Sequence, residues 1–97
     1  MAWAFKFHPA AAKDLYKLSK KNRPLGQAII NTHIPKITVN PHGVGFKKEG
    51  NLSHVRGYGF TYCGSSYRIL YTIAQNSIRF IAFGIHDMAY RKATGRV

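Results

Sequence analysis

The sequence predicts a single α+β domain in which a curved antiparallel sheet carries two helices on one face. Two patterns indicate this class. Helical periods follow one short strand in the first half, and aromatic or β-branched stretches alternate with short turns in the second half. The expected order of elements is β-α-α-β-β-β, with a short final helix. The chain has 97 residues, the size of one domain, so residues 1–97 are treated as one unit.

One strand and a first helix are expected at the N-terminal end. Trp3, Phe5 and Phe7 alternate with small or polar residues, which is the period of a strand. His8-Pro9 then opens a helix, because the missing N–H of proline costs nothing in a first helical turn. The apolar stripe of this helix is expected to face the core and consists of Ala11, Leu15 and Leu18.

A second helix follows the break at Asn22-Arg23-Pro24 and keeps an apolar helical period as far as Ile37. Pro35 removes a backbone donor and disfavours the helical conformation of Ile34. We therefore expect a kink or an early end of the helix at this point. The stretch 40–45 is rich in Pro and Gly and is expected to be a loop.

The second half predicts β-structure. Its aromatic and β-branched stretches are Leu52–Arg56, Phe60–Cys63, Tyr67–Ile73 and Ile78–Ile85. Turn residues at 57–59, 64–66 and 75–77 separate them, and such short connections imply antiparallel neighbours. Cys63 is the single cysteine and is expected to be a small buried residue of a strand.

A short helix over Met88–Thr94 is expected to close the fold. Asp87 precedes it and is a residue type that accepts the first N–H groups of a helix, so it is the expected cap. Gly95 follows and is expected to end the helix.

The charge balance indicates a polyanionic partner. Fifteen Lys/Arg against three Asp/Glu give a net charge of +12. Such a surface favours nucleic acid, an anionic membrane or an acidic protein. Acids are so scarce that a two-carboxylate glycosidase and a carboxylate-bound Mg²⁺ or Ca²⁺ site are disfavoured. One basic stripe is expected on the solvent face of the first helix, formed by Lys13, Lys17 and Lys20.

Nothing in the sequence predicts a metal site or a cofactor. The histidines show no HxH or HExxH spacing, and the chain has no CxxC pair. No stretch approaches the ~20 apolar residues of a membrane span, and the N-terminal residues do not form a signal peptide. With one cysteine and no disulfide framework, a cytoplasmic protein without a membrane partner is expected.

Basic and aromatic residues of the second half remain as candidates for chemistry. His54 and Arg56 are two apart on an expected strand and would share one face. His86 and Tyr90 are four apart where the last strand meets the last helix, so they can share one side of a helical turn. The other members of this cluster are Lys47, Lys48, Arg68 and Arg91.

Three stretches that contain these residues resemble the RelE/ParE superfamily of type II toxins. They are Leu52–Arg56, Gly64–Tyr71 and Gly84–Arg91, and the likeness extends to Pro9–Leu15, so it covers nearly the whole chain. The resemblance implies a RelE-like, microbial-ribonuclease-like fold. It also implies a ribosome-dependent mRNA endonuclease that a cognate acidic antitoxin neutralises.

The resemblance assigns roles to single positions. Arg68 matches the arginine that contacts the scissile phosphate, and Tyr90 matches the C-terminal tyrosine beside the reacting nucleotide. His54 and Arg56 stand where well-studied RelE-type members have two lysines. His86 stands near a family arginine, with a shorter spacing to the tyrosine. These departures favour a variant that uses histidine for proton transfer.

The implied reaction suits this residue inventory. RNA carries its own nucleophile, the 2′-OH, so the enzyme moves two protons and stabilises a phosphorane without a metal. Arginines hold phosphate oxygens throughout. The residues expected to bind RNA backbone are Lys47, Lys48 and Arg91, with Lys13, Lys17 and Lys20 available to ribosomal RNA or to the antitoxin.

Two other functions stay open. The chain could be a ParE-like toxin that inhibits DNA gyrase without cleaving RNA, or a basic module that binds RNA or an antitoxin without catalysis. The His86–Tyr90 corner argues against the gyrase inhibitor, because an inhibitor of that kind needs no proton-transfer residues. Each singled-out residue also has a purely structural interpretation, such as a histidine bonded to backbone or a tyrosine that packs a helix.

Overall fold

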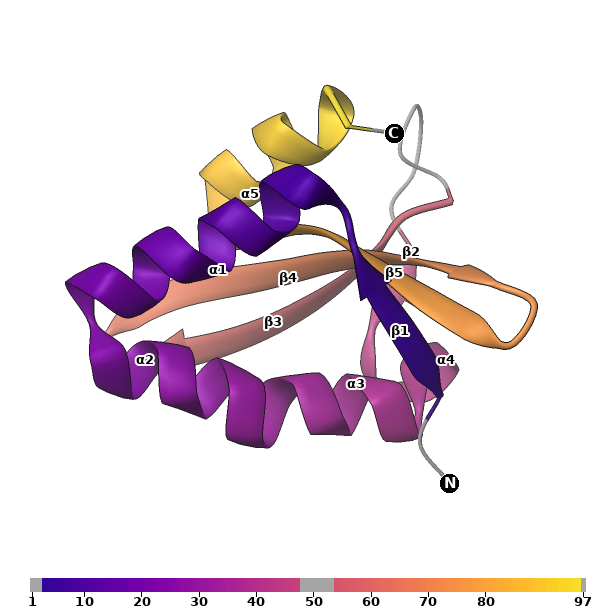
Figure 1. Cartoon of the computed structure of the whole chain (residues 1–97), viewed down its shortest axis with the longest axis horizontal. Coiled ribbons are helices and arrows are strands. Elements are labelled where there is room, and N and C mark those ends of the chain that lie inside the picture. Colours follow the sequence, from indigo (N-terminus) through magenta and orange to yellow (C-terminus); the bar gives the residue numbers. More distant parts are fainter. Residues whose placement is uncertain (1–2, 48–53, 97) are drawn as a thin grey trace.

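The computed structural model describes residues 3–47 and 54–96, which build a five-stranded sheet with helices on both faces (Figure 1). The elements of the first half are β1 (Ala4–Phe7), α1 (Pro9–Lys21), α2 (Arg23–Ala28), the π-helical turn η1 (Ile29–His33), α3 (Ile34–Val39) and α4 (Pro41–Val44). Those of the second half are β2 (Phe46–Lys47), β3 (Arg56–Tyr62), β4 (Ser65–Ala74), β5 (Ser77–Ile85) and α5 (His86–Thr94). The predicted α+β class is confirmed.

The sheet is mixed, which corrects the expectation of a wholly antiparallel one. Its strand order is β1-β5-β4-β3-β2, and β2 to β5 are antiparallel neighbours. β1 instead runs parallel to β5, with Ala4 beside Ser77 and Phe7 beside Phe80. Tight turns dictate the antiparallel pairs, whereas β1 reaches β5 from the other end of the sequence and no turn constrains its direction.

Two hydrophobic clusters lie on opposite faces of the sheet. On one face, the helices α1 to α3 bury Ala11, Leu25 and Ile29 against strand residues such as Ile69 and Tyr71. We call this side the α1–α3 face, and it confirms the prediction of two helical segments packed on one face. On the other, which we call the α5 face, the last helix packs on the sheet through Ala89, Ala93, Val55, Leu70, Ile81 and Ala82.

β3 is one continuous strand, whereas two strands separated by a turn at 57–59 were expected. Gly57 and Gly59 pair with Leu70 and Arg68 of β4 and continue the ladder. The expected strand Leu52–Arg56 begins only at Arg56, since His54 lies in a turn and residues 52–53 lie outside the described residues. Glycine suits position 59 because the guanidinium of Arg68 approaches the backbone closely there.

The β3–β4 hairpin turns at Cys63 and Gly64, which have φ angles of 49° and 84°. Positive φ at both central residues is typical of the type I′ turn that joins strands through two residues. Cys63 is therefore exposed in a turn, and the expectation of a buried strand residue was wrong.

The second helical segment passes Pro35 without ending. Proline stands in the first turn of α3, and the π-helical turn before it bonds the Ile34 N–H to the Ile29 carbonyl. The wider turn accommodates a residue that has no N–H to donate. The stretch after α3 also differs from the expected loop, because Asn40 caps one helical turn, α4, by accepting from the Gly43 N–H at 3.1 Å.

The last helix begins earlier than expected. It starts at His86, and Ile85 occupies the capping position, so Asp87 lies inside the first turn and is not the cap. Gly95 follows the end of the helix, as predicted. None of the helices in the described part of the chain is long and apolar enough to cross a bilayer.

A buried carboxylate joins the two helical layers. Asp14 of α1 accepts hydrogen bonds from Arg96 Nη1 at 2.5 Å, Lys92 Nζ at 3.2 Å and the Phe83 N–H at 3.2 Å. Arg96 Nη1 also donates to the Ile81 carbonyl at 2.9 Å. Because β1 pairs with β5 only as far as Phe80, these bonds satisfy the outward backbone groups of the next β5 residues.

The same contacts set the charge state of Asp14. Burial raises the pKa of its carboxyl group, but hydrogen bonds from Arg96, the Phe83 N–H and Lys92 lower it by more. The net pKa therefore lies below its ordinary value of 3.8, and the group is ionised at neutral pH.

Replacing this carboxylate is expected to destabilise the fold at neutral pH. Asp14→Asn leaves Arg96 and Lys92 without their counter-charge, which costs about 2–3 kcal/mol of unfolding free energy. In the wild type this stabilisation is complete well above pH 3.8 and is lost as pH falls through the lower folded-state pKa. Urea denaturation at pH 7 and pH 3 measures both effects. The variant should lose less stability on acidification, and an equal loss in both proteins would contradict this origin.

Candidate functional site

Arg68 is the predicted site residue with the most distinctive surroundings. It lies in β4 between Gly59 of β3 and Gly84 of β5 in the strand register. Side chains alternate along β4, so Arg68 projects on the α5 face together with Leu70. Its side chain is half-buried there, and Nη1 donates to the Tyr67 carbonyl at 3.2 Å.

Gly59 leaves room for the guanidinium group. A Cβ added to Gly59 would lie 2.6 Å from Cζ of Arg68, so the guanidinium lies directly over this backbone. A Cβ added to Gly84 would meet only Lys92 Nζ and the Ala89 N–H, at 3.8 and 3.9 Å. Nε of Arg68 is buried without a hydrogen-bond partner among the described residues. Nε of Arg56 is in the same state, so the feature that sets Arg68 apart is the position of its guanidinium over the backbone of Gly59.

The last helix brings further predicted residues to the same side of the sheet. Tyr90 of α5 is half-buried and packs on the α5-face cluster. Arg91 is exposed next to it. His86 follows Ile85, which pairs with Tyr67, so the backbone at the start of α5 lies two residues beyond Gly84, the register partner of Arg68. The side chain of His86 lies outside the described residues.

Arg56 is on the opposite side of the sheet from Arg68. It pairs with Tyr71, and its Nη2 donates to the carbonyls of His42 and Gly45 at 2.6 and 2.7 Å. The Tyr71 hydroxyl donates to the Pro41 carbonyl at 2.6 Å. Burial raises the pKa of Tyr71, although Arg56 opposes the rise. Together the two side chains hold the α4–β2 connection against β3, so the structure does not bring the two arginines to one face.

The remaining predicted residues of the second half lie near the segment 48–53. His54 is exposed in the turn before β3, so the argument that it shares a strand face with Arg56 does not apply. Lys47 lies in β2 and pairs with Arg56 through the backbone, but its side chain is outside the described residues. Lys48 also lies outside the described residues.

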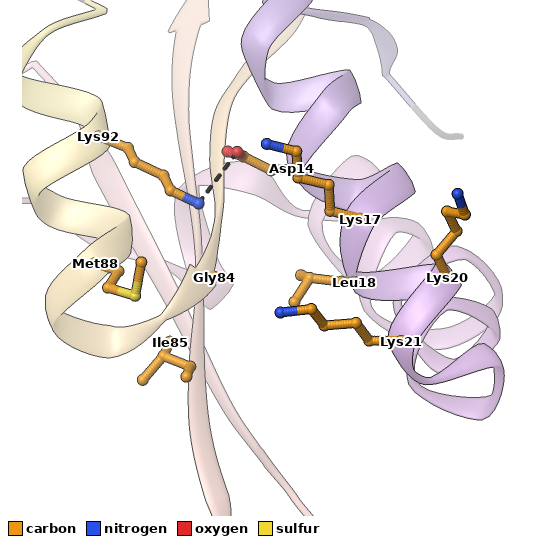
Figure 2. A pocket seen from close by; sticks show the side chains of 9 residues that line it. All are labelled: Asp14, Lys17, Leu18, Lys20, Lys21, Gly84, Ile85, Met88 and Lys92. Carbon is orange, nitrogen blue, oxygen red and sulfur yellow. Dashed lines mark hydrogen bonds and ion pairs between the residues drawn. The ribbon is translucent and has the colours of Figure 1, made fainter.

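The lysine stripe on α1 faces solvent, as predicted, because Lys13, Lys17 and Lys20 are all exposed. Lys17 and Lys20 also line a groove of about 610 Å³ between α1 and α5 (Figure 2). Lys21 and Lys92 line it as well, and sequence reasoning singled out neither. The signal for Lys21 is its place in the last turn of a helix, but no local pattern places Lys92 opposite α1.

His33 makes several side-chain contacts, although the sequence predicts no reactive role for it. Its ring stacks on Phe60 with centroids 3.9 Å apart, and Nδ1 lies 2.8 Å from the Tyr58 hydroxyl. Burial and, to a smaller extent, Lys36 lower its pKa, which favours a neutral ring. The helical period shared with Leu25 and Ile29 already indicates packing on the α1–α3 face, away from Arg68. In the described part of the chain, no three His, Cys, Asp or Glu residues gather as a metal site.

Solved toxin structures share this fold. RelBE2 from Mycobacterium tuberculosis, a toxin–antitoxin complex, is similar with a TM-score of 0.72 and 19% identity over 89% of this chain and 93% of that one. A mutant of the E. coli toxin RelE in the free state is similar with a TM-score of 0.66 and 19% identity, over 100% of this chain and 99% of that one. The YoeB dimer from Staphylococcus aureus is similar with a TM-score of 0.67 and 21% identity, over 89% of this chain and 99% of that one. At these identities the likeness shows the fold alone.

The sequence itself matches a family description over residues 6–94, that of the ParE-like toxin of type II bacterial toxin–antitoxin systems. No curated protein matches the chain. The match spans nearly the whole fold, including Arg68 between its glycines and the helix that carries Tyr90. The chain belongs to the ParE-like toxins of type II bacterial toxin–antitoxin systems.

Proposed function

We propose that this toxin is a ribosome-dependent mRNA endonuclease that inhibits translation by cleaving message in the decoding site. The observation that carries the proposal is the guanidinium of Arg68, which lies half-buried over the backbone of Gly59 on the face of the sheet that also carries Tyr90. A forked, permanently charged donor in a half-buried site is suited to the oxygens of a phosphodiester. Tyr90 on the same face adds an aromatic ring beside the reacting nucleotide.

The proposed reaction is a transesterification within the RNA. The 2′-oxygen loses its proton and bonds to phosphorus, and the bond from phosphorus to the 5′-oxygen then breaks as that oxygen gains a proton. The products are a 2′,3′-cyclic phosphate and a 5′-OH end. Arg68 stabilises the extra negative charge of the phosphorane, and His86 is the proposed proton-transfer group. His54 lies five residues before Gly59, at the other end of β3 from Arg68, and the same role for His54 stays a prediction. Arg56 fixes the neighbouring backbone through its two carbonyl contacts.

The charge distribution supports an RNA target on the ribosome. Asp14 is the only acid whose side chain the structure describes, and Arg96 and Lys92 neutralise it internally. The exposed lysines of α1 and Arg91 are therefore not offset by carboxylates among the described residues. They are proposed to contact ribosomal RNA or message, together with Lys47 and Lys48.

Gyrase inhibition is the second candidate, and the family match to a ParE-like toxin favours it. A toxin of that kind would use the same basic fold as a binding module and would need no proton transfer. The two functions separate in one pair of assays. Inhibition of DNA supercoiling without RNA cleavage would establish the gyrase inhibitor, and the reverse result would establish the nuclease.

Arg68 variants test the nuclease directly. Arg68→Ala is expected to lower cleavage of translated message by about 10²–10³-fold, because it removes a donor to the charged phosphorane. Arg68→Lys should recover only part of the activity, since a point charge cannot form the forked contact. Primer extension on translated message measures the cleavage, with His86→Ala as a second site variant and Arg79→Ala, an exposed β5 arginine, as control. Full cleavage by both site variants would refute the assignment, and an inactive wild type would refute the activity.

Gly59 tests the position of the guanidinium without removing it. Gly59→Ala places a methyl group where the side chain of Arg68 lies, so the guanidinium must move. We expect at least about tenfold slower cleavage with a fold that melts cooperatively. Gly95→Ala is the matched control, because its φ of −83° accepts a side chain at the end of α5. Equal activity of the two alanine variants would show that the close approach has no catalytic role.

The antitoxin partner is testable in cells. Induction of the toxin alone is expected to arrest growth, and co-expression of the acidic protein encoded beside it should restore growth. Colony counts and growth curves measure both. Arrest that persists at full strength beside the co-expressed neighbour would contradict this partner, and harmless expression of the toxin would favour a module without catalysis.

A further inference from the structure

An aromatic pair lies directly behind Arg68, on the opposite face of the sheet. One residue along each strand from the Gly59–Arg68 pair, Phe60 of β3 pairs with Tyr67 of β4. Successive side chains of a strand point to opposite faces, so these two rings lie on the α1–α3 face. The Tyr67 carbonyl also accepts from Nη1 of Arg68 at 3.2 Å. The position of this backbone therefore affects where the guanidinium lies.

Three rings form a stack that includes this pair. Phe60 stacks on Tyr67 with centroids 5.5 Å apart and an interplanar angle of 18°. His33, the last residue of η1, stacks on Phe60 with centroids 3.9 Å apart and an angle of 19°. All three side chains are half-buried. The stack thus connects the helical segment from α2 to α3 with both strands that position the guanidinium of Arg68.

Tyr58 fixes the His33 ring from β3. Nδ1 of His33 lies 2.8 Å from the Tyr58 hydroxyl, and the centroids of the two rings are 5.5 Å apart. Tyr58 is 8% exposed, and burial raises the pKa of its hydroxyl, so this group keeps its proton at neutral pH. The hydroxyl can donate that proton to Nδ1 only while the nitrogen carries no hydrogen. The contact therefore suits a neutral His33 ring.

The surroundings of the ring disfavour a positive charge. Burial and, to a smaller extent, the ammonium group of Lys36 on α3 lower the pKa of His33 below its ordinary value of 6.5. β3 contributes the Tyr58 hydroxyl, and β4 contributes Tyr67 at the end of the stack. Asp14 is the only acid among the described side chains, and it is bonded to the C-terminal residues instead. The ring is therefore neutral at pH 7.

We propose that His33 is a positioning residue whose neutral ring supports Arg68 from the opposite face of the sheet. The stacked rings of Phe60 and Tyr67 transmit this support to the backbone on which the guanidinium lies. Substitution or protonation of His33 lets the β3–β4 pair shift beneath the guanidinium. The kinetic consequence rests on the RNA cleavage proposed above, whereas the coupling between ring and guanidinium is measurable without RNA.

Substitutions in the stack test its kinetic role. Phe60→Leu and His33→Ala both break the stack, and each is expected to lower kcat for cleavage of translated message at least about fivefold at pH 7. KM should change less, because the misplaced guanidinium acts mainly on the phosphorane. His33→Phe restores a stacking ring and should recover most of the rate. Phe5→Leu is the matched control, since it makes the same change at a 46% exposed ring of β1 outside the stack.

Thermal melting confirms that each variant is folded at the assay temperature. Wild-type kcat in both Phe60→Leu and His33→Ala would overturn the proposal. So would a His33→Phe variant as slow as His33→Ala, because a stacking ring would then give no support.

The pH dependence separates this role from simple packing. The His33 ring gains a proton as pH falls through its lowered folded-state pKa, whereas phenylalanine does not titrate. The ratio of wild-type kcat to that of His33→Phe is therefore expected to fall at least about twofold from pH 7 to pH 5. This ratio cancels His86 and His54, which both proteins retain. The carboxyl group of Asp14 titrates below pH 3.8, outside this range. A constant ratio would contradict support by the neutral ring.

Nuclear magnetic resonance tests the coupling in the free toxin. The Nε–H signal of Arg68 is expected to shift with pH at the midpoint of the His33 ring titration, and to lose that shift in His33→Phe. An Arg68 signal that follows neither the His33 titration nor the Phe60→Leu substitution would overturn the positioning role, even where RNA is cleaved. If the wild type cleaves no RNA while the two signals move together, the nuclease is wrong and the support of Arg68 by His33 stands.

Discussion

The carboxylate of Asp14 is the interaction on which the arrangement of this molecule depends. In a chain of charge +12, this buried acid gathers two cations and a backbone N–H, and it thereby joins α1, β5 and α5. Without it, Lys92 and Arg96 would repel each other and the lysines at the end of α1. The distance between α1 and α5, and so the shape of the groove between them, follows from this contact. On the α5 face this contact adds to the apolar packing of Ala89 and Ala93 on the sheet.

The sheet then divides the basic residues between two environments. Alternation along β3 and β4 sends Arg56 toward the α1–α3 face, where carbonyl oxygens take its donors, and Arg68 toward the α5 face. Arg56 and Arg68, which the sequence predicts as members of one cluster, thus have different surroundings. Arg56 holds the α4–β2 connection through two carbonyl oxygens, whereas the guanidinium of Arg68 lies over Gly59 on the face that carries α5. This division explains why the proposed chemistry centres on Arg68 and α5.

Local sequence patterns predicted much of this fold. The predictions failed where a contact with a residue distant in the sequence decides the local structure. Stretches rich in aromatic and β-branched residues identified β4 and β5, and the helical period placed Leu25 and Ile29 in the core. Gly59 was mistaken for a turn because a sequence cannot show that an arginine from the next strand lies over it.

The candidate site was predictable to a similar extent. Arg68 and Tyr90 could be named from their surroundings in the sequence, and the structure puts them on one face of the sheet. Arg56 lies on the other face of the sheet because of the register of β3. Strand propensities do not show at which residue β3 begins. Asp14 stands out as an acid within the apolar stripe of a helix, but its partner Arg96 is 82 positions away along the chain. Contacts of that separation arise only when the whole sheet has formed. The roles of Arg68, Tyr90, His86 and the other predicted site residues all stay predictions.

The way β5 ends has a consequence for the behaviour of the protein at high concentration. An uncovered strand edge invites pairing with another molecule, and β1 protects β5 only as far as Phe80. Beyond that point, the Asp14 carboxylate and the Arg96 guanidinium occupy the backbone groups that an incoming strand would need. Arg96 lies just past the last helix, where residues are often dispensable. Here Arg96 occupies the Ile81 carbonyl and so leaves an incoming strand without that acceptor.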